Sequence, residues 1–307
     1  MLEMRSNNDK IQKNNTDEIL LILTVDIYYD IEYTNSYNLH NIDLLEKISL
    51  IINEIINNSK ITWLLSDDEK IIKKFLSLKN RIIRKNDEIG LHCLISKFHN
   101  IEESKIEDLD NYIRKSVKLL ESYKVFPKSI RIAGCASSNN LLSALAKHKI
   151  LIDSSALPNR KRVIPIKFNW EITDSVPYYP SKDDYRIPNE DMTKCHEILE
   201  LPITTLLTQT KYDKEPYLRY FDLTFHTNVI KNQIDKIINS ENIIVAIIHP
   251  MQILEMKNKN ELYCDSLEEF KNTLKLFVET CNKHGKKIKC VTMSECKNYF
   301  KTNNFNY

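Results

Sequence analysis

Apolar residues follow two alternating rhythms along this 307-residue chain. Continuous apolar runs rich in β-branched residues are typical of strands buried on both faces, and residues 18–26 (EILLILTVD) form the clearest of them. Between these runs, apolar residues recur at helical spacing, as Ile106, Leu109, Ile113 and Val117 do. The two rhythms predict strands over residues 18–26, 60–65, 88–94, 129–133, 150–153, 197–202, 243–249 and 287–291. They predict helices over residues 42–57, 68–83, 104–123, 139–148, 228–240 and 266–284, with a short helix from residue 294.

The alternation of strands and helices predicts an α/β domain on a parallel sheet, either closed into a barrel or left open. We expect this single domain to span residues 18–303, after a flexible N-terminal arm over residues 1–17. Residues 155–195 carry five prolines and paired tyrosines, which predicts a long irregular insertion. The alternation resumes after residue 195, which favours one interrupted sheet over two domains.

Charge and glycine content exclude several classes of function. Lysine and arginine total 44 and aspartate and glutamate 42, so the formal net charge is +2. We expect no nucleic-acid partner, because neutralising phosphates needs a basic excess on one face. The three glycines, Gly90, Gly134 and Gly285, are too far apart for the phosphate-binding turns of a Rossmann fold or a P-loop.

The cysteines and the N-terminal segment bear on the compartment. The seven cysteines include no C-x-x-C pair, so neither a zinc ribbon nor a thioredoxin-like site is expected. The first 18 residues are polar and lack the apolar core of a signal peptide. No segment approaches the roughly 18 apolar residues of a membrane span. We expect a cytoplasmic protein with reduced thiols, and the oligomeric state stays open.

Polar side chains stand at the carboxyl ends of several predicted strands. Asp26 follows the first strand, His92 ends the third and His249 ends the strand IIVAIIH. Arg131 lies within the fourth strand and Asp153 ends the fifth. Because active sites of α/β sheets and barrels lie at this end of the strands, these residues are candidates for one site.

Each candidate also has a simpler interpretation. Asp26 could cap a loop, although an acid directly after six apolar residues is costly to bury without a role. His92 would fit a buried core histidine equally well, and His99 lies in a polar loop where solvation is expected. Arg131 needs a partner, for which Asp26 and Asp153 are both suitable.

Several short segments together resemble the polysaccharide deacetylase (carbohydrate esterase) family. Their order and spacing match that family from about residue 18 to residue 300, and RIAG followed by a helix and DSS is the most specific part. The resemblance implies a distorted (β/α) barrel. The matching segments are LTVD (23–26), EIGLH (88–92), RIAG (131–134), ALAKHKILIDSSALP (144–158), EILELP (197–202), IIHP (247–250) and VTMSECKNYF (291–300).

The resemblance also implies roles for particular residues. Asp26 corresponds to the catalytic base, Arg131 to the arginine that orients it and His249 to the late acid. His92 corresponds to the first histidine of a divalent metal site, most often zinc, which would polarise an amide carbonyl. For substrate binding, the resemblance points to Trp170, Tyr178 and Gly134. The aromatic rings of Trp170 and Tyr178 would suit stacking on a sugar face.

The sequence departs from the family at the metal site. Ile27 stands where the common pattern has a metal-binding aspartate, and the stretch HCLISKFH lacks a second histidine at the usual spacing. Asp30 and His99 would have to complete the ligand set with His92, since catalytic zinc normally keeps three protein ligands. The other interpretations are a site that works without metal and a chain that has lost catalysis.

These residues support two main hypotheses of function. The first is a hydrolase that removes an N-acyl group from an amino sugar or a sugar precursor in surface-glycan biosynthesis. The alternative is an inactive carbohydrate-binding protein on a deacetylase scaffold. A third interpretation is hydrolysis of another substrate, such as a cyclic amide, on the same barrel.

Overall fold

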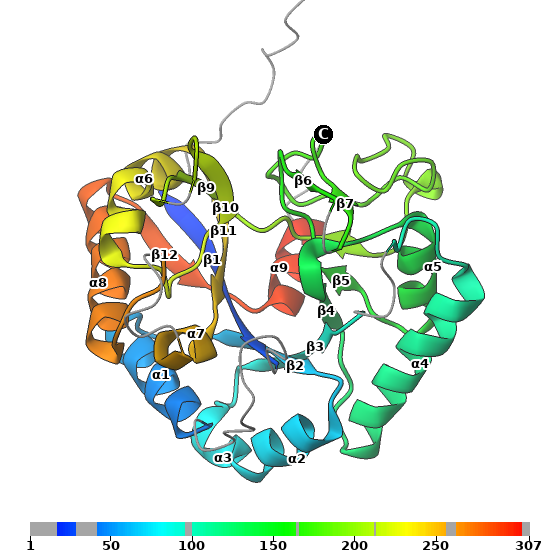
Figure 1. Cartoon of the computed structure of the whole chain (residues 1–307), viewed down its shortest axis with the longest axis horizontal. Coiled ribbons are helices and arrows are strands. Elements are labelled where there is room, and N and C mark those ends of the chain that lie inside the picture. Colours follow the sequence, from blue (N-terminus) through cyan, green and yellow to red (C-terminus); the bar gives the residue numbers. More distant parts are fainter. Residues whose placement is uncertain are drawn as a thin grey trace, which may run out of the picture.

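A computed structural model describes residues 17–28, 42–95, 100–163, 166–211, 213–255 and 262–302 (Figure 1). In this part of the chain, a parallel sheet of eight strands has the order β11-β1-β2-β3-β4-β5-β8, and β12 also pairs with β1. The strands are β1 (Glu18–Ile27), β2 (Ile61–Ser66), β3 (Glu88–Cys93), β4 (Ser129–Ile132), β5 (Ile152–Asp153), β8 (Leu199–Glu200), β11 (Ile243–Ile248) and β12 (Lys287–Cys290).

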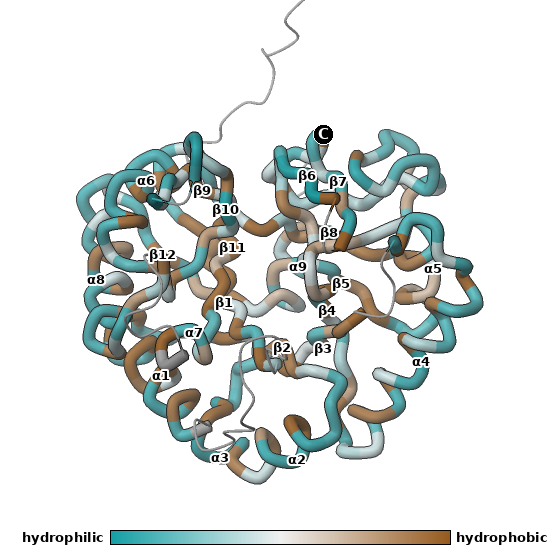
Figure 2. The backbone as a smooth tube through the Cα atoms, in the orientation of Figure 1, coloured by the Kyte–Doolittle hydropathy of each residue, from teal (hydrophilic) through white to brown (hydrophobic). Residues whose placement is uncertain are grey.

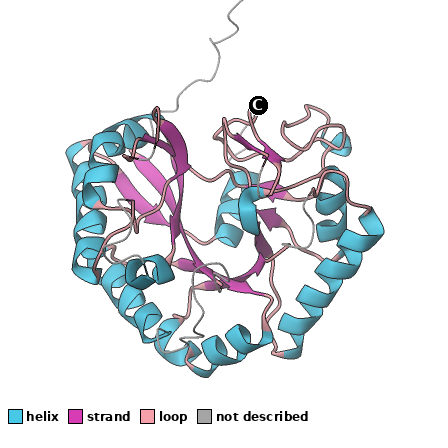
Figure 3. Ribbon diagram, in the orientation of Figure 1, coloured by secondary structure: helices cyan, strands magenta, loops and turns pink. Residues whose placement is uncertain are grey.

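The sheet curls so that its two edges approach each other (Figure 3). The segment after β8 bonds to β11, because the Thr204 amide donates to the Val245 carbonyl over 3.2 Å. The Leu223 amide likewise donates to the Ile247 carbonyl over 2.9 Å. These backbone bonds link segments that follow β8 and β10 (Tyr217–Tyr220) to the edge strand β11, across the gap between the two ends of the curled sheet.

Helices cover the outside of this barrel, and Figure 2 shows apolar residues along the strands and polar ones over the outer helix surfaces. No described helix combines the length and apolar character that crossing a membrane requires. The helices are α1 (Ile42–Ile55), α2 (Glu69–Ser77), α3 (Lys79–Ile82), α4 (Ile106–Ser122), α5 (Asn139–Lys147), α6 (Thr227–Ser240), α7 (Pro250–Glu255), α8 (Leu267–Lys283) and α9 (Met293–Thr302).

The two faces of β1 show how the barrel is filled. Alternate residues of a strand point to opposite faces, and Leu21, Leu23 and Ile27 belong to the large cluster beneath the helices. Leu20 and Ile22 belong instead to a second cluster, which includes side chains of α9. Helix α9 therefore closes the amino-terminal end of the barrel interior and leaves the carboxyl ends of the strands for a site.

Lys297 fixes α9 in this position. Its ammonium group donates to the carbonyls of Leu151 and Glu197, over 2.8 and 3.0 Å, just before β5 and β8. The side chain is 6% exposed, so both bonds are shielded from water.

Most of the predicted elements are present, with four differences, one of which is that α7 (Pro250–Glu255) was not predicted. The helix predicted over residues 68–83 is split into α2 and α3, because Leu78 leaves the helical conformation (φ −112°, ψ 6°). The irregular insertion contains a short hairpin of β6 (Lys161–Arg162) and β7 (Phe168–Asn169). A second hairpin, β9 (Thr205–Thr208) with β10 (Tyr217–Tyr220), was not predicted. The predicted arm lies outside the described residues except for Asp17.

Candidate active site

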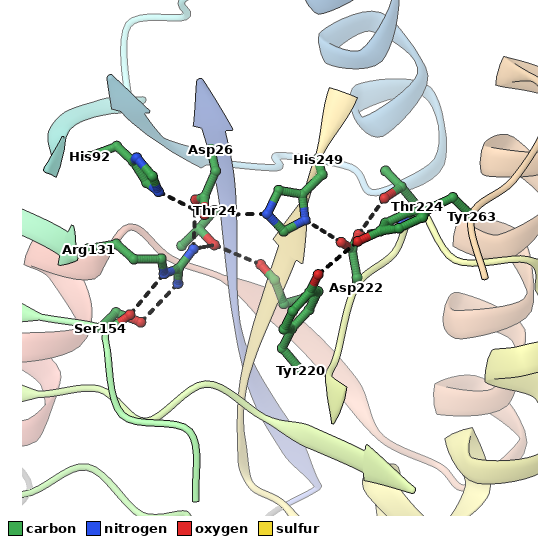
Figure 4. A network of polar contacts seen from close by, with 11 residues as sticks. Thr24, Asp26, His92, Arg131, Ser154, Tyr220, Asp222, Thr224, His249 and Tyr263 are labelled. Carbon is green, nitrogen blue, oxygen red and sulfur yellow. Dashed lines mark hydrogen bonds and ion pairs between the residues drawn. The ribbon is translucent and has the colours of Figure 1, made fainter. Parts of the chain in front are cut away.

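Four of the predicted site residues meet at the carboxyl ends of the strands (Figure 4). Asp26 lies near the end of β1, His92 near the end of β3 and Arg131 in β4, and His249 directly follows β11. All four side chains are buried, with exposed fractions between 2% and 8%. Their strands place them around one point inside the barrel mouth, although they are far apart in sequence.

Arg131 holds the carboxylate of Asp26 in a fixed position. Its Nη1 donates to Asp26 Oδ1 and to Thr24 Oγ1, each over 2.7 Å. Its Nε donates to the Ser154 carbonyl over 2.8 Å, and its Nη2 donates to Ser154 Oγ over 2.9 Å. The guanidinium is thus anchored at the residue that follows β5 and bonds to β1, and of the two predicted partners Asp26 is the one in direct contact.

Two imidazoles flank the other oxygen of Asp26. His92 Nε2 lies 3.6 Å and His249 Nε2 3.7 Å from Asp26 Oδ2. Both distances exceed that of a hydrogen bond, so Oδ2 remains available to a small molecule. Tyr28 stacks on His92 with ring centroids 4.9 Å apart and meets His249 edge-on at 6.0 Å.

A narrow pocket reaches this group. It is lined by Asp26, Tyr28, His249, Met251 and Gln252. The last two belong to α7, which begins directly after His249, so α7 forms one wall of the entrance.

The three titratable groups differ in charge state. Burial opposes ionisation of Asp26, but the positive charge of Arg131 and the two imidazoles outweigh it and lower the pKa of Asp26. Burial lowers the pKa of His92 to about 4, so its imidazole is neutral at pH 7. Burial also disfavours the charged form of His249, but Asp222 outweighs it and raises the pKa of His249. The site therefore pairs an ionised carboxylate with an imidazole that favours its proton.

Asp222 is a site residue that the sequence did not reveal. Its Oδ2 is hydrogen bonded to His249 Nδ1, which turns Nε2 toward Asp26. Its Oδ1 accepts hydrogen bonds from the Thr224 amide and hydroxyl, over 2.8 and 2.6 Å. The signal was an acid between apolar residues in FDLTF (221–225), outside any predicted strand.

Tyr220 also packs against His249. Its ring lies 5.4 Å from the imidazole, and its hydroxyl is 2.7 Å from that of Tyr263. Both tyrosines stand beside Asp222 in Figure 4. Together they restrict the rotation of the imidazole.

A second pair of acids lies on the other side of Arg131. Asp153 and Glu200 occupy paired positions on β5 and β8, and both are at most 1% exposed. Burial raises the pKa of Asp153 to about 7. Burial and the neighbouring Asp153 raise the pKa of Glu200 well above its usual value. The pair therefore retains protons at a pH where isolated carboxyl groups have lost them.

The predicted substrate-binding residues are enclosed by protein. Trp170 and Tyr178 are each 1% exposed, so neither ring has an open face for stacking on a sugar. Trp170 Nε1 donates to the Cys135 carbonyl over 2.7 Å, and the Tyr178 hydroxyl donates to the Tyr185 carbonyl over 3.1 Å. Gly134 has φ +79°, and a Cβ there would approach Ile166 to 2.8 Å. These residues hold the insertion against the barrel.

The described residues do not fit the metal site that the resemblance implies. His92 is the one predicted ligand among them, since Asp30 and His99 lie outside the described residues. Ile27 cannot replace the usual aspartate, because it has no donor atom and packs among the outer apolar residues. Within the described ranges, no group of three histidine, cysteine or acidic side chains is arranged to hold an ion.

No protein-family model matches this sequence, and no curated protein matches it either. Among solved structures, a proposed glycoside hydrolase/deacetylase from Parabacteroides distasonis aligns with a TM-score of 0.63 over 95% of this chain and 73% of its own. A proposed polysaccharide deacetylase from Mycobacterium smegmatis aligns with a TM-score of 0.58 over 94% of this chain and 92% of its own. The chain has the fold of the polysaccharide deacetylases. The sequence identities are 14% and 12%, so the likeness confirms the predicted deacetylase barrel, and function must be argued from the site.

Proposed function

We propose that this deacetylase-fold chain is a hydrolase that removes an N-acyl group from an amino sugar or a sugar precursor. The observation that carries the proposal is the position of Asp26. Its Oδ1 is held by Arg131 and its Oδ2 lies between His92 and His249, and Asp26 and His249 line the same pocket. A fixed, ionised carboxylate opposite an imidazole is the arrangement that general acid–base cleavage of an amide requires.

The chemistry assigns one proton transfer to each of these two groups. Asp26 Oδ2 takes a proton from a water molecule as the oxygen of that water attacks the amide carbon. The carbon–nitrogen bond then breaks, and His249 Nε2 gives its proton to the leaving amine. Asp222 stabilises the protonated imidazole and directs Nε2 at the reacting atoms. The products are a free amine and a carboxylic acid, and no step is assigned to a metal.

The finer parts of the proposal are the pathway and the compartment. We propose a precursor of a surface glycan as the substrate and the cytoplasm as the location. In support, the seven cysteines form no disulfide with one another, as expected in a reducing compartment.

One observation favours a second candidate, an inactive carbohydrate-binding protein. Ile27 removes a ligand that the family pattern places beside Asp26, and a scaffold that has lost catalysis would tolerate that change. Under this alternative, sugars would bind without being hydrolysed.

Release of acyl groups from a panel of N-acyl amino sugars and their nucleotide conjugates tests the two candidates, with and without added Zn²⁺. We expect release by the wild-type chain and a loss of about 10²–10⁴-fold in His249→Gln, the range typical of a general acid. His148→Gln is the matched control, because His148 pairs with Asp110 far from the site. Binding of the panel without any release would overturn the hydrolase and support the binding protein.

A further inference from the structure

Two hairpins bring three arginines together beside the proposed active site. Arg160 and Arg162 belong to the β6–β7 region and Arg219 to β10, and Figure 1 shows the two hairpins on the same side of the molecule. The guanidinium of Arg160 lies 4.0 Å from the ring centre of Tyr217 on β10, and that of Arg162 lies 4.8 Å from the ring centre of Phe168 on β7. We call Arg160, Arg162 and Arg219 the arginine cluster.

The charges of this cluster are not balanced among the described residues. Arg219 is neutralised by Asp213, which accepts two hydrogen bonds from its Nη2 over 2.9 Å. Arg162 donates instead to two backbone carbonyls, those of Gly134 over 2.8 Å and Ile166 over 3.0 Å. Arg160 donates to the hydroxyl of Tyr217 and contacts no described carboxylate.

Arg160 is the more unusual of the two unneutralised arginines. Its side chain is 9% exposed, and burial lowers its pKa. Holding a guanidinium out of water without a counter-charge is costly. Arg131 and Arg186 avoid this cost because each contacts a carboxylate, which Arg160 does not do among the described residues. An anion at this position would remove that cost.

The cluster lies within reach of Asp26 and His249. Arg162 Nη2 donates to the carbonyl of Gly134, which lies three residues after Arg131 on the segment that follows β4. Along β10, Tyr217 contacts Arg160, and Tyr220 contacts His249 with ring centroids 5.4 Å apart. Three residues of strand span about 10 Å, so one extended molecule can contact both groups.

We propose that Arg160 and Arg162 form an anion-binding subsite that holds the phosphate or diphosphate of a phosphorylated amino-sugar substrate. Guanidinium groups suit this role because they donate paired hydrogen bonds to phosphate oxygens. The N-acyl group would then lie over Asp26 while the phosphate contacts the arginine cluster. The choice of substrate rests on the proposed function, whereas the anion site itself does not depend on catalysis.

Calorimetric titration of the full chain with pyrophosphate at constant ionic strength tests the subsite directly. We expect saturable binding to the wild type and at least about ten-fold weaker binding to Arg160→Gln/Arg162→Gln. Arg160→Lys, which keeps the charge, should bind between the two. The control Arg114→Gln removes one exposed positive charge from α4 and should bind as the wild type does. Absence of binding by the wild type, or equal binding by the double variant, would overturn the subsite.

Kinetics then identify the source of the anion. We compare kcat/KM for a nucleotide-linked or 1-phosphorylated N-acetyl sugar with kcat/KM for the free sugar. In Arg162→Gln the ratio of the first to the second should fall at least about ten-fold, because KM for the phosphorylated sugar rises. A fall confined to N-acetylated uronic acids would replace phosphate by carboxylate and overturn the phosphate assignment. Pyrophosphate binding without hydrolysis would overturn the proposed function alone, and hydrolysis of free sugars without pyrophosphate binding would overturn the subsite alone.

Discussion

Arg131 separates two groups of buried acids that behave in opposite ways. On one side, Asp26 is 3% exposed, and the charge of Arg131 outweighs burial and lowers its pKa. On the other, Asp153 and Glu200 are equally buried, and burial raises the pKa of both. Depth is the same on the two sides, so it does not decide which acid is ionised.

The difference lies in what the oxygens contact. Asp26 Oδ1 accepts a charged hydrogen bond from Arg131 over 2.7 Å. Glu200 Oε1 accepts from the amides of Ser155 and Ala156, and Asp153 Oδ1 accepts from the Ser155 hydroxyl. Neutral donors stabilise a carboxylate less than a guanidinium does, and the second acid nearby opposes ionisation. Direct contact with one arginine therefore separates Asp26, the proposed catalytic base, from Asp153 and Glu200, which we call the structural pair.

Removing the guanidinium should have the largest effect on stability. Arg131→Met leaves the carboxylate of Asp26 buried without its partner, which we expect to lower the free energy of unfolding by about 3–5 kcal/mol. Urea denaturation at pH 7 measures this change. Arg186→Met is the control, because its pair with Asp184 is partly exposed and should cost about 1 kcal/mol or less. Equal losses in the two variants would contradict the special role of Arg131.

The structural pair should make the protein less stable as the pH rises. The folded pKa of Asp153 is raised to about 7 and that of Glu200 is raised well above its usual value, whereas both groups ionise near pH 4 when unfolded. The folded chain binds more protons in this window, so the free energy of unfolding falls from about pH 4 to about pH 7 and above.

Glu200→Gln keeps the shape of the side chain and removes one of the two titrating groups. The decrease in unfolding free energy between about pH 5 and 8 should shrink by on the order of 1–3 kcal/mol. Denaturation series at several pH values, with Glu121→Gln on the exposed face of α4 as control, check this. A pH slope unchanged in Glu200→Gln would show that the pair does not hold its protons.

The smallest of these effects concerns His249, the proposed general acid. Asp222 raises the pKa of His249 against the opposing effect of burial, so Asp222→Asn should lower it. The alkaline limb of the kcat/KM profile should therefore move to lower pH. Asp110→Asn removes a carboxylate from another histidine, His148, and should leave the profile in place. A limb that stays fixed in Asp222→Asn would assign the acid role to another group.

The sequence predicted the sheet and the catalytic candidates for the same reason. Continuous apolar runs identify strands buried on both faces, and a polar residue at the end of such a run is conspicuous, as Asp26 and His249 are. The carboxyl ends of parallel strands lie at the same edge of the sheet, so the alternation of strands and helices predicted that these side chains meet. The hairpin of β9 and β10 was missed because its strands are short and partly exposed.

The features of the site that the sequence did not predict depend on partners that are distant in the chain. Asp222 meets His249 across 27 residues, and nothing in FDLT marks that contact. Trp170 was predicted to bind substrate, yet its indole is buried, and its Nε1 donates to the carbonyl of Cys135, 35 residues away. Patterns of local spacing reveal which face a residue occupies, but not which distant group will satisfy it.

The most direct test of the account compares kcat/KM for acyl release in Asp26→Asn and Glu200→Gln, two near-isosteric changes on opposite sides of Arg131. We expect a loss of about 10²–10⁴-fold in Asp26→Asn. In Glu200→Gln we expect a loss of less than about ten-fold, which corresponds to about 1.4 kcal/mol. Wild-type activity in Asp26→Asn, or equal losses in the two variants, would contradict the assignment of Asp26 as the reactive acid.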